Sequence, residues 1–396
     1  MTSNFIISVL LARWLSPQDY GAFVVAYAIL WGLTNVHISL LTEPLGVFGP
    51  GRYKGRLSEY LGILLYGHLG FSVIAGMLLL LLSMAFELAG SKALSSALLS
   101  LALAGPLVLF LRGLMRQACY VQLKPRLAAL GGASYMALVL PGVYFLYQRD
   151  WLSAGVGLLL MGFASLVAGL GLAVALRMSP TRLKGNGLLR EVFNDHWGYG
   201  RWAVPSNGLG FIASQGYLLL LPIWGGLAAS ATFRALTNLT TPIVHIASAF
   251  SLYLLPILVQ ARGRSEFGRY MRFALALFIV GSGFYWLLLG FFHRPLVTWL
   301  YGGHYEQYAH LLWLIGLVPL LQGLVSLLGA ALRALERPDQ IFWAQVLASA
   351  VALTVGLGFL VTWGVVGAAL GSIVSQMAAV GALAWLLWRS KGSRDR

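Results

Sequence analysis

Apolar stretches of about 20 residues recur along this chain from one end to the other. A helix of that length matches the hydrocarbon thickness of a lipid bilayer. Of the 396 residues, 59% are hydrophobic and 10% are charged, whereas a soluble domain carries about 25% charged residues. The sequence therefore predicts an all-α, polytopic membrane protein. A transmembrane β-barrel would need alternating segments of about ten residues, and the sequence does not show them.

Reading the apolar blocks between polar breaks predicts about twelve transmembrane segments. Their cores are residues 4–15, 20–41, 61–85, 93–111, 127–147, 153–176, 202–224, 231–253, 273–292, 311–332, 341–362 and 365–388.

The basic residues test this division. If alternate loops face the cytoplasm, 22 of the 27 Lys and Arg residues fall on one side of the membrane and 5 on the other. Cytoplasmic loops are enriched in Lys and Arg, so the asymmetry predicts that both termini are cytoplasmic. The formal charge of +15 is explained in the same way, without a nucleic-acid partner.

Several short motifs recur at an offset of 210–213 residues, which predicts an internal repeat. The matched pairs are Trp151 with Trp363, Gly90 with Gly302, Arg177 with Arg389, Lys124-Pro125 with Arg337-Pro338, and Phe23 with Phe233. Six helices per repeat is an even number, so the halves share one orientation and form a parallel repeat. The first segment is too short to span a bilayer. We expect a first helix truncated at its N-terminus, the alternative being a half-helix that ends inside the membrane.

The predicted domains are an N-terminal six-helix lobe (residues 1–176), a cytoplasmic connector (177–201), a C-terminal six-helix lobe (202–388) and a basic cytoplasmic tail (389–396). Within the connector, apolar and polar residues alternate at helical spacing. The apolar side holds Leu188, Leu189, Val192, Phe193 and Trp197, and the polar side holds Arg190, Glu191, Asn194 and Asp195. This pattern predicts an amphipathic helix on the inner membrane surface.

The sequence gives no sign of catalysis. All twelve carboxylates are expected in loops or at helix ends, no phosphate-binding glycine loop is present, and the seven histidines lack metal-ligand spacing. The single cysteine, Cys119, excludes an internal disulfide. We therefore predict no enzyme activity, catalytic residue, metal or cofactor. Ion-coupled pumps normally bury an acid within their spans, so a carboxylate-coupled cation exporter is disfavoured.

One predicted segment carries a polar stripe. Arg234, Asn238, Thr241 and His245 follow the spacing i, i+4, i+7, i+11 and would share one helix face. They are interpreted either as the wall of a substrate cavity, with Arg234 meeting phosphate, or as helix–helix hydrogen bonds plus an Arg that reaches the headgroups.

The other lobe holds three further substrate-cavity candidates. At the repeat offset, Asn35 lies on the matching face of segment 20–41, and His37, two residues further on, is a possible companion. Arg13, near the outer end of the first segment, is either an interfacial anchor or a second phosphate contact.

Four stretches resemble a known family. They are LLARWLSPQDYGAFVVAYAI (residues 10–29), LLTEPLGVFGPGRY (40–53), YGGHYEQYAHLLWLIG (301–316) and WGVVGAALGSIVS (363–375). They are similar to the corresponding regions of the polysaccharide flippase family, in its exopolysaccharide-associated branch. That family belongs to the superfamily that also contains the multidrug and toxic-compound extrusion (MATE) transporters and the lipid II flippases.

The resemblance implies a MATE-like fold, with two six-helix lobes around a cavity lined by helices 1, 2, 7 and 8. It also implies a flippase of the bacterial inner membrane that translocates undecaprenyl-pyrophosphate-linked oligosaccharide by alternating access, for exopolysaccharide or O-antigen synthesis. Its partners would be this lipid-linked oligosaccharide, membrane lipids and glycan polymerase or assembly proteins. Two alternatives stay open: an ion-coupled small-molecule exporter on the same fold, and a non-transporting membrane partner of a glycan assembly complex.

Overall fold

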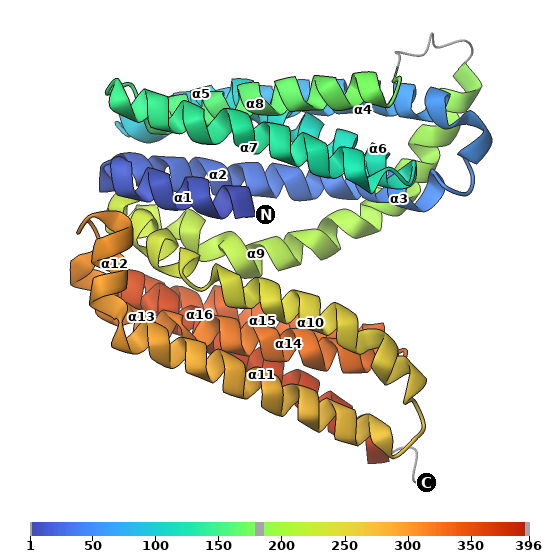
Figure 1. The fold of residues 1–396 in the computed structure, drawn as a ribbon, viewed down its shortest axis with the longest axis vertical. Coiled ribbons are helices and arrows are strands. Elements are labelled where there is room, and N and C mark those ends of the chain that lie inside the picture. Colours follow the sequence, from blue (N-terminus) through green and yellow to red (C-terminus); the bar gives the residue numbers. More distant parts are fainter. Residues whose placement is uncertain (1, 179–185, 393–396) are drawn as a thin grey trace. The chain divides into compact units, whose positions relative to one another are not determined.

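The computed structural model describes residues 2–178 and 186–392. Every regular element in these two ranges is a helix (Figure 1), which confirms the all-α class. Ten helices among the described residues are long and apolar enough to cross a membrane. Two parts of the predicted cytoplasmic segments, residues 179–185 of the connector and 393–396 of the tail, lie outside the described residues.

Each predicted segment has a helical counterpart. The first corresponds to a shorter apolar helix, Phe5–Trp14, and the last two share the long span Asp339–Arg389. Gly364 separates these two with φ 55° and ψ −122°, and Gly226 interrupts helix α9 (Asn186–Asn238) with φ 69° and ψ 174°. Glycine adopts positive φ without steric penalty, so both breaks fall where the side chain is absent.

The chain divides into two compact units. We call Trp14–Phe211 the N-terminal unit, and Met1–Arg13 together with Ile212–Arg396 the C-terminal unit. Helix α9 contributes its first part, up to residue 211, to the N-terminal unit and its remainder to the C-terminal unit.

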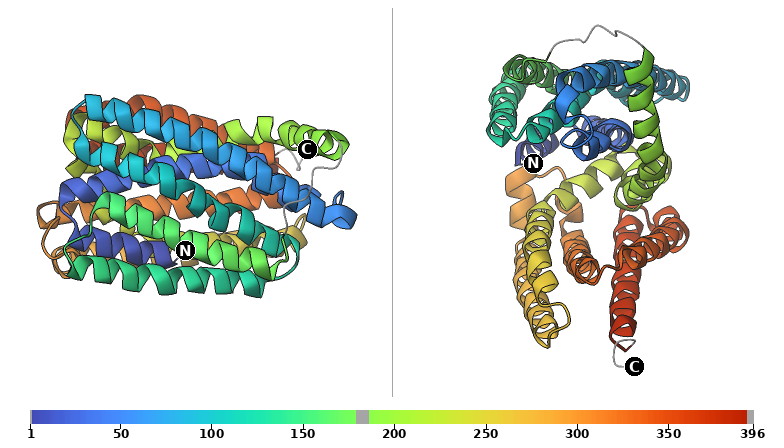
Figure 2. Two further views of the ribbon diagram at one scale, coloured as in Figure 1. Left: turned by 90° about the horizontal axis from the view of Figure 1, so that it is seen from above. Right: turned by 90° about the vertical axis from the view of Figure 1, so that its right-hand side faces the viewer.

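Helix α5 is the centre of the N-terminal unit, where it packs against α2, α4 and α8 (Figures 1 and 2). It is the most buried of the described spans, and small residues along it let its neighbours approach closely. Besides the start of α9, the unit consists of α2 (Pro17–His37), a π-helical turn η1 (Ile38–Thr42), α3 (Glu43–Phe48), a 3-10 turn η2 (Lys54–Arg56), α4 (Leu57–Leu88), α5 (Lys92–Leu109), a π-helical turn η3 (Phe110–Met115), α6 (Arg116–Val121), α7 (Pro125–Gln148) and α8 (Ala154–Ala175).

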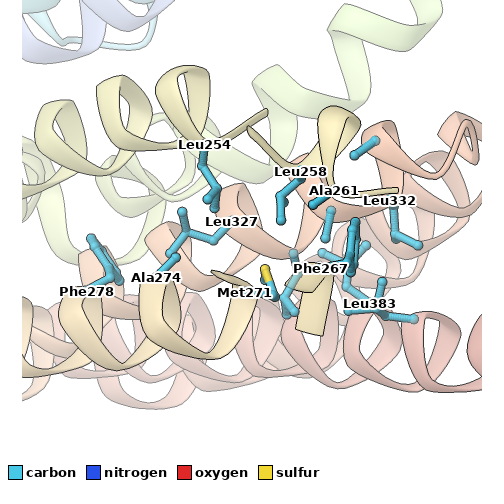
Figure 3. Packing of buried hydrophobic residues seen from close by; sticks show 14 of the residues in the cluster. Leu254, Leu258, Ala261, Phe267, Met271, Ala274, Phe278, Leu327, Leu332 and Leu383 are labelled. Atoms are coloured by element: carbon cyan, nitrogen blue, oxygen red, sulfur yellow. The ribbon is translucent and has the colours of Figure 1, made fainter. Parts of the chain in front are cut away.

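Helix α14 has the central position in the C-terminal unit, where it contacts α10, α11 and α16. Side chains of these four helices form an apolar core that includes Leu258, Phe278, Leu327 and Leu383 (Figure 3). Besides the end of α9, the unit consists of α1 (Thr2–Trp14, as far as Arg13), α10 (Thr241–Gln260), α11 (Glu266–Phe291), α12 (His293–Tyr301), a 3-10 turn η4 (Glu306–Leu311), α13 (Leu312–Ile315), α14 (Leu317–Ala334), α15 (Pro338–Val351), a π-helical turn η5 (Ala352–Gly356) and α16 (Leu357–Gly392).

The predicted repeat is visible in the backbone. Gly90 (φ 80°) ends α4 and is matched by Gly302 (φ 63°). Leu123 (φ 56°) and Glu336 (φ 59°) are matched in the same way, and each precedes a basic residue and the proline that begins α7 or α15. Proline is favoured in the first helical turn. The repeat therefore preserves the turns that connect equivalent helices.

We predict that Gly323→Ala destabilises the protein, because a Cβ at this position of α14 would overlap the Phe278 ring of α11. Overpacking of this kind costs about 1–3 kcal/mol, so the thermal unfolding temperature of the purified protein should fall. Gly329→Ala, on the same helix, is the matched control because its added Cβ meets no atom within 4 Å. Equal unfolding temperatures for the two variants would contradict this packing.

Candidate substrate site in the C-terminal unit

A cavity of about 270 Å³ lies within the C-terminal unit. Its wall is formed by the end of α9, the start of α10, the start of α14 and the middle of α16. Ten of its fourteen lining residues have polar side chains, although these helices are apolar overall. The lining residues are Gln215, Tyr217, Leu218, Phe233, Arg234, Thr237, Thr240, Thr241, Val244, Val318, Gln322, Ser372, Ser375 and Gln376.

Arg234 gives this cavity its charge. It is the charged residue among the described lining residues, and no carboxylate is present there. No described side chain forms an ion pair with its guanidinium. A charged group within membrane-spanning helices is costly unless it faces a cavity or a partner. The five N–H donors of a guanidinium suit carboxylate or phosphate oxygens, so the cavity favours an anionic group.

The hydroxyl groups of the lining are oriented by their own helices. Thr237 Oγ1 donates to the carbonyl of Phe233 at 2.9 Å, Ser372 Oγ to Ala368 at 2.8 Å, and Thr240 Oγ1 to Thr237 at 2.8 Å. Each hydroxyl has one hydrogen to donate and two lone pairs. The oxygens therefore remain available as acceptors, while Arg234 and the glutamine amides supply donors. A ligand rich in hydroxyl groups could use both.

Tyr217 closes one side of the cavity by inserting between two glycines. Its hydroxyl donates to the carbonyl of Ala352 at 3.3 Å, and a Cβ on Gly356 or Gly371 would collide with the same hydroxyl. These glycines therefore allow α9, which also carries Arg234, to approach η5 and α16 closely.

The polar stripe predicted on one continuous helix is interrupted. Helix α9 ends at Asn238 and α10 begins at Thr241. The free Leu239 carbonyl is satisfied within the protein, since Tyr285 Oη donates to it at 2.5 Å. Leu239 and Thr240 are both buried, and irregular backbone at membrane depth is tolerated where it is buried in protein. The prediction of a shared helix face is wrong for this reason, because Leu239 and Thr240 form a turn.

The four stripe residues consequently have different surroundings. Arg234 and Thr241 line the cavity. Asn238 is 1% exposed and donates through Nδ2 to Ser8 Oγ of α1 at 2.8 Å. His245 is exposed on α10.

Arg13 ties α1 to α12, because its guanidinium donates to the Trp299 carbonyl at 2.8 Å. Its side chain is exposed and is not part of the cavity lining.

Asn35 and His37 belong to the N-terminal unit. Asn35 donates to the Trp31 carbonyl of its own helix at 2.8 Å. His37 has no exposed surface and contacts His68 of α4, with Nε2 and Nδ1 separated by 3.1 Å. Neither residue contributes to the cavity around Arg234.

Polar contacts hold the first part of α9 against the other helices and turns of the N-terminal unit. Arg52 pairs with Asp195 at 2.7 Å and with Glu191 at 3.4 Å, and Tyr53 Oη donates to Asp195 at 2.6 Å. At the next residue, His196 Nδ1 lies 2.7 Å from the Leu40 carbonyl. The predicted amphipathic segment is therefore held through its polar side.

The other side of this segment is apolar and exposed. Leu189, Phe193 and Trp197 are spaced four residues apart and are 40%, 65% and 56% exposed, respectively, whereas Val192 is buried. A stripe of this kind suits insertion into the headgroup region of a membrane.

Glu43 is placed deeper in a helix than the sequence suggested. It lies within the continuous helical run Pro17–Phe48, accepts a hydrogen bond from Tyr199 Oη at 2.8 Å, and lines a second cavity of about 420 Å³ with Trp202 and Asn207. Burial and the bond to Glu43 raise the pKa of Tyr199 to about 12, so this tyrosine remains a donor.

Sequence reasoning missed most of the cavity lining. Gln322 and Gln376 are uncharged amides within apolar spans, and the rule that singled out Arg234 applies to them as well. Thr237, Ser372 and Ser375 carry no such signal, because Ser and Thr are common at ordinary helix contacts in membranes. Among the described residues, no group of three or more His, Cys, Asp or Glu side chains could hold a metal ion.

Comparison with solved structures shows the fold. The lipid II flippase MurJ in an inward closed conformation matches with a TM-score of 0.79 at 12% identity, over 98% of this chain and 85% of that chain. An inward-facing multidrug resistance MATE family transporter matches with a TM-score of 0.73 at 15% identity, over 99% and 95%. A transporter of the same superfamily, called MOP, from Pyrococcus furiosus matches with a TM-score of 0.61 at 16% identity, over 98% and 92%.

No family model and no curated protein matches this sequence. The matches to solved structures show that the chain has the MOP-type fold expected from the resemblance. They do not show the exopolysaccharide-associated branch.

His196 gives a prediction about pH. The Leu40 carbonyl can only accept, so His196 Nδ1 must carry the hydrogen, and Nε2 then accepts from Tyr60 Oη at 2.6 Å. Burial lowers the pKa of His196, although the Leu40 carbonyl and Asp195 partly oppose this shift.

The unfolded chain, with a histidine pKa of about 6.5, therefore takes up the proton at a higher pH than the folded protein. The contribution of His196 to the free energy of unfolding is therefore fully present above about pH 6.5, and it declines as the pH falls below that value. Thermal unfolding temperatures measured against pH should show a smaller acid-side decline for His196→Gln than for the wild type. Identical declines would contradict the assignment.

Proposed function

We propose that this protein is a flippase that moves undecaprenyl-pyrophosphate-linked oligosaccharide from the inner to the outer leaflet of the bacterial inner membrane by alternating access. The protein is not an enzyme in this proposal, and both of its termini are cytoplasmic. The glycan would serve exopolysaccharide or O-antigen synthesis, with polymerase or assembly proteins as further partners.

The observation that carries the proposal is the cavity around Arg234. A guanidinium without a carboxylate partner, set among hydroxyl and amide groups within apolar helices, matches a ligand that combines phosphate with sugar. Arg234 would bind the pyrophosphate, and the glutamine and threonine side chains would hydrogen-bond to the sugar. The fold shared with the lipid II flippase MurJ supports the same class of substrate.

Export of small molecules is the second candidate, because MATE transporters share the fold. Organic cations are attracted by carboxylates and repelled by a guanidinium, and the described cavity lining holds Arg234 and no acid. The cavity in the C-terminal unit therefore favours the flippase.

Reconstituted flipping tests the proposal. In proteoliposomes that carry a fluorescent prenyl-pyrophosphate-linked sugar, Arg234→Ala should slow translocation about tenfold or more, because a hydrogen bond to a charged group contributes about 1.5–3 kcal/mol. Arg234→Lys should be slowed less, since it retains the charge and loses the planar fork.

Arg264→Ala is the matched control, because Arg264 is an exposed residue between α10 and α11 of the same unit. It should flip at the wild-type rate. Equal rates for Arg234→Ala and Arg264→Ala would exclude Arg234 as a substrate contact. Absence of flipping by the wild type would favour the non-transporting partner, and efflux of a cationic dye instead would favour the exporter.

A further inference from the structure

Two histidines meet inside the N-terminal unit, at the depth of its membrane-spanning helices. His37 ends α2 and His68 lies in α4, and they are 0% and 3% exposed. Their rings are nearly perpendicular, with centroids 5.2 Å apart, and His37 Nε2 lies 3.1 Å from His68 Nδ1. An ionisable group placed in a span marks a functional site by default.

The hydrogen count of the pair leaves one nitrogen unsatisfied. Two neutral imidazoles carry two N–H hydrogens, and one of these forms the bond between the rings. His68 Nε2 has Ser72 Oγ at 3.5 Å, whereas His37 Nδ1 is buried and has no hydrogen-bond partner among the described residues. A buried polar atom in this condition costs about 1–3 kcal/mol.

The backbone is shaped to admit this ring. Gly113 lies in the π-helical turn η3, and a Cβ there would come within 2.8 Å of both Cε1 and Nδ1 of His37. His37 itself directly precedes the π-helical turn η1. Turns of this kind occur frequently at functional sites. The unsatisfied nitrogen therefore lies between two segments with irregular helical hydrogen bonding.

No acid in the part of the chain that the structure describes forms an ion pair with either histidine. Of the charged groups on neighbouring elements, Arg112 of η3 donates to Tyr27 Oη at 2.7 Å, and Arg116 donates to Tyr120 Oη at 3.2 Å. Glu43, which follows η1, accepts from Tyr199. The aromatic neighbours of the pair are Phe71, against the His37 ring, and Phe110, against the His68 ring.

From this arrangement we propose that the His37–His68 pair binds and releases one proton in each transport cycle, so that flipping is coupled to the proton gradient. The inference rests on the proposed transport function. The proton comes from water on one side of the membrane, forms an N–H bond on the pair, and is returned to water on the other side. The central N–H···N bond then becomes charge-assisted and stronger.

The coupling follows from the cost of the charge. An imidazolium pair among phenylalanine rings, without a counter-ion, is unfavourable in hydrocarbon. Protonation therefore favours a conformation in which the histidine pair gains access to water. Loss of the proton favours the conformation in which the pair is buried, as it is in this structure. A ligand shifts a conformational equilibrium by its difference in affinity for the two states, and the proton is that ligand.

Flipping under an imposed pH gradient tests the proposal. With one proton per cycle, each unit of pH difference should change the steady-state ratio of the fluorescent lipid-linked probe between the leaflets about tenfold. His37→Gln and His68→Gln should each abolish this dependence, whereas His304→Gln, an exposed histidine before η4, should retain it. The proposal would be overturned if the wild-type ratio did not change with the pH gradient, or if it changed a hundredfold per pH unit. It would also be overturned if the ratio still changed with the gradient in His37→Gln or His68→Gln.

A second measurement does not depend on transport. Nitrogen NMR of histidine-labelled protein in nanodiscs should show the His37 and His68 rings changing protonation in one shared step upon acidification, with the step altered at one ring when the other is replaced. If the wild type does not flip the probe and this shared step is present, the transport function fails and the proton site stands. Independent titration of the two rings would overturn the proton site.

Discussion

Every polar group within the membrane-spanning part of this protein must find its partner inside the protein, because lipid offers none. Most do so in a local way. Tyr285 satisfies the carbonyl left free at the end of α9, Tyr301 donates to the Ala235 carbonyl at 2.7 Å, and Asn238 is paired with Ser8. A few buried side-chain atoms among the described residues nevertheless have no hydrogen-bond partner, and Nδ1 of His37 is one of them. The Arg234 guanidinium is a second kind of exception, because no described side chain forms an ion pair with it. The functional account depends on these two exceptions.

The exceptions differ in kind and belong to different units. Arg234 faces a polar cavity and carries a permanent charge, which suits recognition of an anion. His37 faces another histidine among aromatic rings, and an imidazole, unlike a guanidinium, can both gain and lose a proton. Neither has a carboxylate partner among the described residues. In the proposed mechanism, a histidine pair therefore offers ion coupling to a chain whose proposed substrate is anionic, without placing a negative charge that would repel that substrate.

Local patterns predicted the fold well. Hydrophobic length fixes the spans, and the matched motifs at Gly90 and Gly302 mark backbone positions with positive φ that only the turn geometry explains. The site was predicted in part. Arg234 could be found because a charge in a span is conspicuous. The break at Leu239–Thr240 also has a local signal, since Pro242 lies in the first turn of α10. The bond from Tyr285 to the Leu239 carbonyl, by contrast, joins residues 46 positions apart in the sequence. The pairing of His37 with His68 is likewise a tertiary contact, which helical periodicity within one segment does not encode.

The central claim is that the cavity of the C-terminal unit recognises the pyrophosphate of a lipid-linked substrate. It is tested most directly by equilibrium binding to the purified protein in nanodiscs, comparing a prenyl pyrophosphate with the prenyl alcohol of the same chain length. The account predicts that the pyrophosphate binds more tightly, that salt weakens its binding, and that Arg234→Gln removes the difference. Equal affinity for the two lipids in the wild type would contradict it.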